Sequence, residues 1–373
     1  MSFRKIRNIS DIGDNMKTKE KAALVQQFVT EGRFLAMPMT FEGESYPIPP
    51  DESYLNAFAE NPKGDQFYGS TGGKKCHVFA GGAKGACGGI LDLGVAEGAF
   101  DIPVVLHLKS FEKHYKTYEN IIFIANMQDE ATIYCSTVLL SHDSIQEPSF
   151  YSFPFEPLTS LLGTRFFDAV LTPDCQFLIG LSDKGILSIE IETGKVNKVF
   201  ECNLNATFIK KLAQLDDQAY FIDKQGEFIA LDLSSLSCTP TGIKGNFDEK
   251  SWGFCICQNS ILYANGSGKL FAFDTQNKSI VEAGQAPLPK MQCMCNLPDN
   301  RIFGVCGAEI GFFFRFDFAS GTSEALGAIV TAMGTRRYGF EFSKMTTGKD
   351  GEIYLCENDR GGHLWIYSPS ISI

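Results

Sequence analysis

The chain has 373 residues, of which 44% are hydrophobic, and it carries a net charge of −11. It has no run of lysine and arginine, which argues against a nucleic acid as main partner, because binding to a phosphate backbone depends on clustered cations. Most of the 12 cysteines lie within apolar stretches, as buried free thiols do in a reducing compartment, so we expect a cytoplasmic protein.

The chain begins with a segment, residues 1–32, that lacks the apolar core of a signal peptide. Ala22, Val25 and Phe28 are spaced as on one face of a helix, which predicts a short lead-in helix. No apolar run reaches membrane-spanning length, so we expect no membrane partner. The prolines between Arg33 and Ile48 suit an edge strand, and this segment is our candidate for a strand that closes the fold.

A short pattern recurs through the C-terminal half of the chain. A turn is followed by about five mainly apolar residues and then, in most copies, by an acid. The copies end at Glu190, Asp232, Asp274, Asp317 and Ser368, in steps of 42, 42, 43 and 51 residues. A second apolar run precedes each copy. A period in the low forties with two to four short strands is typical of the blades of a β-propeller.

Extending this period to the whole chain predicts an all-β, seven-bladed propeller as a single domain over residues 33–373. The first two blades are placed by spacing more than by matching residues, so six or eight blades also fit. Residues 111–120 break the pattern and suggest an inserted rim helix. The predicted blades start near Phe58, Leu106, Arg165, Thr207, Ser251, Lys290 and Tyr338.

The third blade has the most complete repeat, LTPDCQFLIGLSDKGILSIEIETGKV from Leu171. It resembles propeller repeats that combine Ser/Thr-Pro-Asp, an apolar strand, a short polar turn, a second strand and Thr-Gly-Lys. Later blades match in part, so that the resemblance covers roughly two thirds of the chain. It implies the fold but no particular function, because proteins of many functions share such repeats.

The turns of a four-stranded antiparallel blade alternate between the two faces of the disc. Turns into the innermost strand and turns between the second and third strands therefore share one face, where a ligand site is expected. The arginines on this face can bind a carboxylate, sulfate or phosphate group, and the tryptophan can stack on a ligand. The alternative is that the charges are solvated and the histidines structural. The candidate ligand-binding residues are Lys75, His77, Arg165, Asp168, Trp252, Arg336, Arg337, Glu357, Asp359, Arg360 and His363.

The sequence contains no phosphate-binding loop and no nucleophile elbow, and we expect no cofactor. The histidines are not spaced as metal ligands are. Four cysteines form two Cys-x-Cys pairs, Cys255/Cys257 and Cys293/Cys295, whose thiols either bind zinc or pack as small apolar groups. We therefore expect a protein that binds a small anionic or carbohydrate ligand, or a protein partner, at the channel mouth. The alternative is a carbohydrate-active lyase or hydrolase with His77 or His363 as acid/base.

Overall fold

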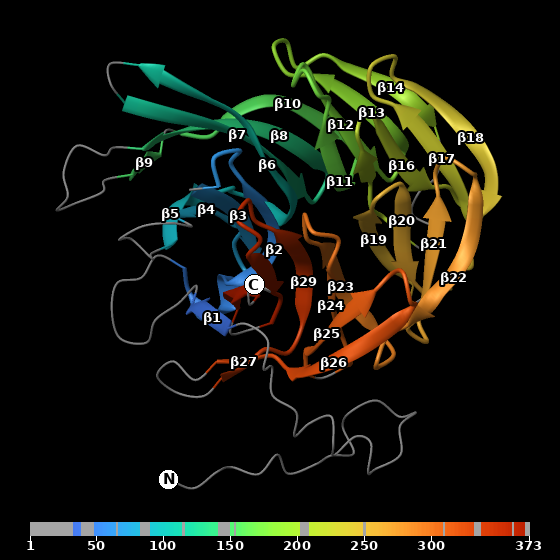
Figure 1. Ribbon diagram of the computed structural model, residues 1–373. Coiled ribbons are helices and arrows are strands. Elements are labelled where there is room, and N and C mark those ends of the chain that lie inside the picture. Colours follow the sequence, from blue (N-terminus) through green and yellow to red (C-terminus); the bar gives the residue numbers. More distant parts are fainter. Residues whose placement is uncertain are drawn as a thin grey trace, which may run out of the picture.

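The computed structural model contains seven antiparallel sheets that follow one another around a ring, the arrangement of a β-propeller (Figure 1). The predicted all-β, seven-bladed fold is confirmed. The structure describes residues 33–38, 48–64, 66–82, 90–113, 116–140, 150–152, 154–201, 209–248, 251–308, 310–331, 337–359 and 362–369.

The first strand of each blade is innermost, and neighbouring first strands contact one another around most of the ring. Blade 1 has β2 (Tyr54–Glu60), β3 (Gln66–Gly72), β4 (His77–Gly82) and β5 (Ile90–Val95). Blade 2 has β6 (Ala99–Lys113), β7 (Lys116–Met127), β8 (Glu130–Leu140) and β10 (Glu156–Leu162), with β9 (Phe150–Ser152) paired to the end of β8. Blade 3 has β11 (Phe166–Leu171), β12 (Phe177–Ser182), β13 (Gly185–Glu190) and β14 (Val196–Glu201).

The remaining blades repeat this order. Blade 4 has β15 (Ala213–Leu215), β16 (Gln218–Ile222), β17 (Glu227–Asp232) and β18 (Ser237–Lys244). Blade 5 has β19 (Trp252–Cys257), β20 (Ser260–Ala264), β21 (Lys269–Asp274) and β22 (Ser279–Gln285). Blade 6 has β23 (Met291–Asn296), β24 (Ile302–Cys306), β25 (Phe312–Asp317) and β26 (Thr322–Ala328). The predicted starts of blades 3, 5 and 6 fall one residue before the observed ones, and the other four are four to seven residues away.

Blade 7 takes its outermost strand from the other end of the chain. Its strands are β29 (Phe342–Thr347), β30 (Ile353–Glu357), β31 (His363–Ser368) and β1 (Arg33–Pro38). Six residues of β1 pair with β31, from Arg33 opposite Ser368 to Pro38 opposite His363. The predicted closing strand is thus confirmed, and the predicted lead-in helix lies outside the described residues.

The prediction of a rim helix at residues 111–120 is wrong. The chain continues as β6 up to Lys113 and returns as β7 from Lys116, so that a long hairpin forms in place of a helix. Phe111 pairs with Tyr118 across this hairpin, and their rings stack with centroids 5.2 Å apart. Aromatic cross-strand pairs stabilise sheets, and this pair favours a hairpin although the neighbouring polar residues suggested a helix.

Three short elements complete the described part of the chain. They are a 3-10 turn, η2 (Pro50–Glu52), and a two-stranded hairpin of β27 (Val330–Thr331) and β28 (Arg337–Tyr338). The hairpin lies at the rim beside β1, beyond the end of β26 (Figure 1). Among the described residues no helix is long and apolar enough to span a bilayer.

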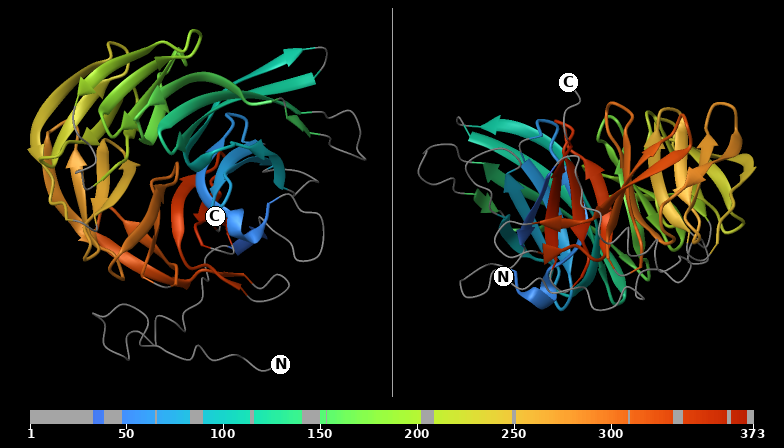
Figure 2. Two further views of the ribbon diagram at one scale, coloured as in Figure 1. Left: turned by 180° about the vertical axis from the view of Figure 1, so that it is seen from behind. Right: turned by 60° about the horizontal axis from the view of Figure 1, so that its bottom comes forward.

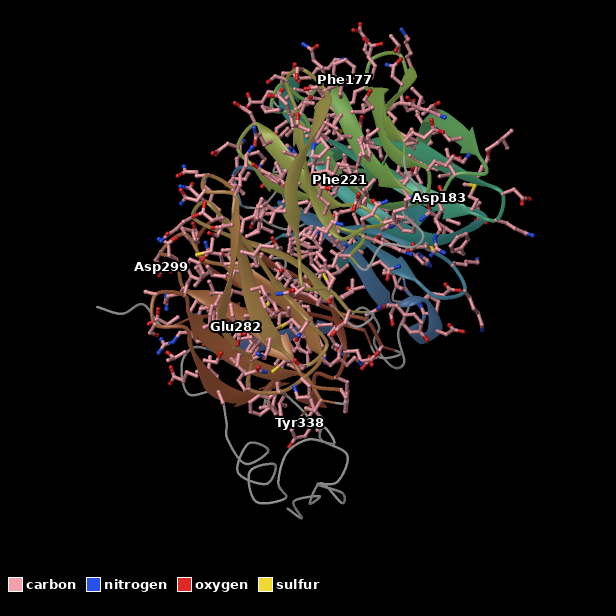
Figure 3. All side chains as sticks on the ribbon, turned by 90° about the vertical axis from the view of Figure 1, so that its right-hand side faces the viewer. Phe177, Asp183, Phe221, Glu282, Asp299 and Tyr338 are labelled. Atoms are coloured by element: carbon pink, nitrogen blue, oxygen red, sulfur yellow. The ribbon has the colours of Figure 1, made fainter. Side chains whose placement is uncertain are left out.

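Aromatic side chains fill the space between adjacent blades. Phe228 of blade 4 stacks on Phe273 of blade 5 at 4.2 Å between ring centroids, and Phe58 of blade 1 stacks on Tyr354 of blade 7 at 4.7 Å. Phe221 lies among the ribbons in Figure 3, and it is fully buried. This packing explains the many buried phenylalanines among the described residues, because each blade packs against its neighbours.

The acid that ends most copies of the repeat accepts hydrogen bonds from the turn that follows it. Asp232 Oδ1 accepts from the backbone N–H groups of Ser234 (3.0 Å) and Ser235 (2.7 Å). Asp274 and Asp317 bind their turns in the same way. These bonds, those from Ser235 first, lower the pKa of Asp232 because they favour the charged carboxylate. The repeat therefore ends in an acid because an Asx turn follows its third strand.

Candidate functional site at the channel mouth

Six of the seven innermost strands are irregular near their first residues. At each bulge the innermost strand has an extra residue that is not paired with the second strand. Such bulges change the direction in which nearby side chains point. Because successive strands of a blade run in opposite directions, all the bulges lie at the same end of the channel, which we call the channel mouth. The extra residues are Asn56, Phe100, Phe167, Gly253 with Phe254, Gln292 and Ser343.

Several bulge residues bind the next blade of the ring. Gln292 Oε1 accepts a hydrogen bond of 2.8 Å from the backbone N–H of Phe342. Ser343 Oγ in turn donates to the carbonyl oxygen of Leu55 at 2.5 Å, which joins blade 7 to blade 1. The bulges therefore join neighbouring blades around the channel mouth.

The residue that follows the bulge is charged in blades 2, 3 and 7, where it is Asp101, Asp168 and Lys344. Asp168 Oδ2 accepts a hydrogen bond of 2.9 Å from the backbone N–H of Leu212 in blade 4. Lys344 Nζ donates to the carbonyl oxygen of Phe58 in blade 1 at 3.0 Å. Three half-buried charges are thus held in fixed positions close to the channel.

These charges act on one another across the axis of the ring. Burial lowers the pKa of Lys344, the carboxylate of Asp168 opposes this, and the ammonium group of Lys211 adds to it. Asp168 and Lys211 belong to blades 3 and 4, neither of which is a neighbour of blade 7. The three side chains therefore face the same channel from different sides.

Arg165 extends this group of charges to the outer surface. It is exposed and lies over the ring of Phe100, with 5.2 Å between the guanidinium carbon and the ring centroid. Burial raises the pKa of Asp101, whereas a hydrogen bond from Asn126 and the charges of Arg165 and Lys211 act in the opposite direction. We call Asp101, Arg165, Asp168, Lys211 and Lys344 the mouth cluster.

A cavity of about 300 Å³ lies further along the same innermost strands. Strands β15, β19, β23 and β29 line it, among other residues with Gln214, Asn296 and Thr347. Asn296 Oδ1 is buried, and no group among the described residues donates a hydrogen bond to it. A buried acceptor without a donor is costly unless a bound molecule satisfies it.

Two histidines predicted as site residues are buried and bound to carboxylates. His77 Nδ1 lies 2.8 Å from Asp92 Oδ2, and His77 Nε2 lies 3.0 Å from Glu52 Oε2. His363 Nδ1 lies 2.8 Å from Glu357 Oε2. Each histidine is only 4% exposed, so neither ring faces the channel mouth as an acid/base would have to.

Burial opposes the charged form of His77, but hydrogen bonds to Asp92 and Glu52 overcome it and raise the pKa of the imidazole above its ordinary value of 6.5. A raised pKa stabilises the fold fully below that ordinary value, and the contribution is lost as the pH rises through the folded-state pKa. We expect His77→Gln to reduce the free energy of unfolding more just below pH 6.5 than at a clearly alkaline pH. Urea unfolding of both proteins tests this, and a difference that does not vary with pH would contradict it.

The other predicted site residues are dispersed. Trp252 is half-buried and packs against two apolar clusters. One cluster is shared by blades 5 and 6, and the other by blades 6 and 7. Lys75 is exposed in the turn before β4, and Asp359 is half-buried after β30. Arg337 belongs to the peripheral β27–β28 hairpin, while its side chain, Arg336 and Arg360 lie outside the described residues. Of the predicted residues whose side chains the structure describes, only Arg165 and Asp168 belong to the mouth cluster.

The two Cys-x-Cys pairs lie in a group of buried free thiols in blades 5, 6 and 7. Burial raises the pKa of Cys295 and Cys306 to about 12, as expected for thiols packed among apolar side chains. The two carboxylates that bind His77 lie at opposite nitrogens of its ring and cannot converge on one ion. In the part of the chain that the structure describes, no three histidine, cysteine or acidic side chains are placed to hold a metal ion.

Asp101, Lys211 and Lys344 were not among the site residues predicted from the sequence. The signal was available: Asp101, Asp168 and Lys344 are each the third residue of an innermost strand. Aligning the blades on that strand, instead of on the third strand where the repeat is clearest, would have placed them together. A search against models of known protein families finds no match to this chain. A search of curated proteins finds no similar sequence either.

Proposed function

We propose that this propeller is a binding protein that takes a small anionic, hydroxylated ligand, such as a sugar acid or a sugar phosphate, at the channel mouth. The mouth cluster carries this proposal. Arg165, Lys211 and Lys344 supply cations for the anionic group, and carboxylates beside them can accept hydrogen bonds from hydroxyl groups.

The channel cavity supports a ligand with hydroxyl groups. Its volume of about 300 Å³ is at the lower end of the range for small-molecule sites. The unpartnered Oδ1 of Asn296 needs a donor, which a hydroxyl group or a water bound beside the ligand would supply. The ten described cysteines are free, which favours a reducing compartment, and we propose a cytoplasmic protein on that basis.

Calorimetric titration with glucuronate, glucose 6-phosphate and neutral glucose tests the proposal. We expect Lys211→Ala to weaken binding of an anionic sugar by about tenfold, because it removes a half-buried cation from the site. Lys195→Ala removes the same charge from a turn on the opposite face and should change nothing. Equal binding of glucose and the anionic sugars, or no binding of any of them, would contradict the proposal.

The lowered pKa of Lys344 adds a check on the same site. An anion bound beside this lysine favours its charged form, so binding takes up protons where the free side chain is partly neutral. Affinity should then fall as the pH rises through the lowered pKa of Lys344. The proton uptake is measured by repeating the titration in buffers of different ionisation enthalpy.

A further inference from the structure

The hairpin of blade 2 extends well beyond the ring. Strands β6 and β7 have 15 and 12 residues, whereas the innermost strands of the other blades have three to seven. Figure 1 and the left view of Figure 2 show the hairpin projecting from the propeller. Residues 109–113 of β6 are exposed, and along this stretch β6 pairs only with β7 among the described strands.

A groove of about 880 Å³ lies between this hairpin and the turns of blade 3 on the face opposite the channel mouth. On the hairpin side it is lined by Lys109 and Lys113, with the stacked rings of Phe111 and Tyr118 between them. Three glutamates are among the residues that line the other side: Glu156 at the start of β10, Glu190 at the end of β13, and Glu192 in the turn that follows β13.

The two sides of the groove carry opposite charges that do not neutralise each other. Lys109, Lys113, Glu156 and Glu192 are exposed, and no ion pair joins the lysines to the glutamates. The groove thus presents both charges to solvent, and an occupant with both charges would complement it.

We infer that this groove binds an extended peptide segment of a partner protein in which acidic and basic residues alternate. Successive side chains of an extended chain point to opposite sides. Acidic residues of the segment would then face Lys109 and Lys113, and the intervening basic residues would face the glutamates. The Phe111–Tyr118 pair supplies an aromatic surface for the segment between the charges.

A second copy of this chain is a poorer occupant. If β6 paired antiparallel with β6 of another copy about Phe111, each Lys109 would lie opposite a Lys113 of the other copy. Like charges directly opposite each other destabilise strand pairs, and lysines on a free edge commonly prevent such pairing. The sequence of the strand thus disfavours this pairing between two copies of the chain.

Fluorescence anisotropy with short dye-labelled peptides tests this inference. The probes are an alternating Glu-Lys peptide, a block peptide of the same composition, an all-Glu peptide and an all-Lys peptide. We expect the alternating peptide to bind about tenfold tighter than the block peptide at low salt. The variant Glu156→Lys/Glu192→Lys should come to prefer the all-Glu peptide, and Lys109→Glu/Lys113→Glu the all-Lys peptide.

A matched control exchanges two charges elsewhere on blade 3. Lys198→Glu/Glu201→Lys reverses an exposed ion pair of β14 and should keep the preference for the alternating peptide. Equal binding of the alternating and block peptides would overturn the inference, as would reversed variants that keep the wild-type preference. Self-association of the wild type that either reversal abolishes would also overturn it, since a second copy would then be the occupant.

Discussion

Replacing Glu357 with alanine is expected to lower the free energy of unfolding by about 3–5 kcal/mol. Glu357 is 1% exposed and accepts three hydrogen bonds. Its Oε2 accepts from Trp365 Nε1 at 2.9 Å and lies 2.8 Å from His363 Nδ1, and its Oε1 accepts from the backbone N–H of Phe340 at 3.2 Å. Alanine leaves three donors without an acceptor inside blade 7, and each unmade hydrogen bond is costly there.

Glu357→Gln serves as the matched variant. Its single amide oxygen can replace only part of the carboxylate, so we expect a loss between that of the alanine variant and zero. Chemical unfolding of the three proteins measures these differences. If Glu357→Ala were within about 1 kcal/mol of wild type, the carboxylate would not organise this part of blade 7.

The second large effect is expected where the ring closes. Met37 of β1 is opposite Leu364 of β31, is buried, and packs with residues of both blade 7 and blade 1, among them Leu55. An aspartate at this position would place a charge without a partner between the first and last blades. We expect Met37→Asp to destabilise the protein by several kcal/mol, roughly 3 or more, and to expose the edge of β31.

Closure of the ring can be tested locally, by hydrogen exchange, as well as by the stability of the whole protein. Hydrogen exchange should increase first in β31 and in the strands of blade 1 that contact it. Met37→Leu keeps the volume and apolar character of the side chain, and should cost less than about 1.5 kcal/mol. A Met37→Asp protein with wild-type stability and exchange would mean that β1 does not hold the ring together.

The sequence predicted the blades best where packing repeats. Strands whose two faces are both buried, such as Glu227–Asp232, must alternate with turns at a regular spacing, and that spacing reveals the ring. The hairpin of blade 2 was misread because its outer half is exposed and therefore polar. No blade-like pattern of apolar residues marked it, and its strand pairing is seen only in the structure.

The candidate site could be predicted less well, for a geometrical reason. Reasoning from turns alone groups all the residues of one face, but the bulges and the twist of each blade decide which side chains reach the axis. His77 and His363 are on the predicted turns, yet they are directed into the protein toward acids. Lys344 is within the strand Phe342–Thr347, whose sequence gives no sign of a site, yet its ammonium group lies among the charges of the channel.

A crystal structure of the protein soaked with glucuronate would test the central claim most directly. The account predicts that the carboxylate lies within hydrogen-bonding distance of Lys211 or Arg165, with hydroxyl groups directed toward the cavity that Asn296 lines. Glucuronate ordered only elsewhere, or an empty channel mouth at a concentration that saturates binding in solution, would contradict it.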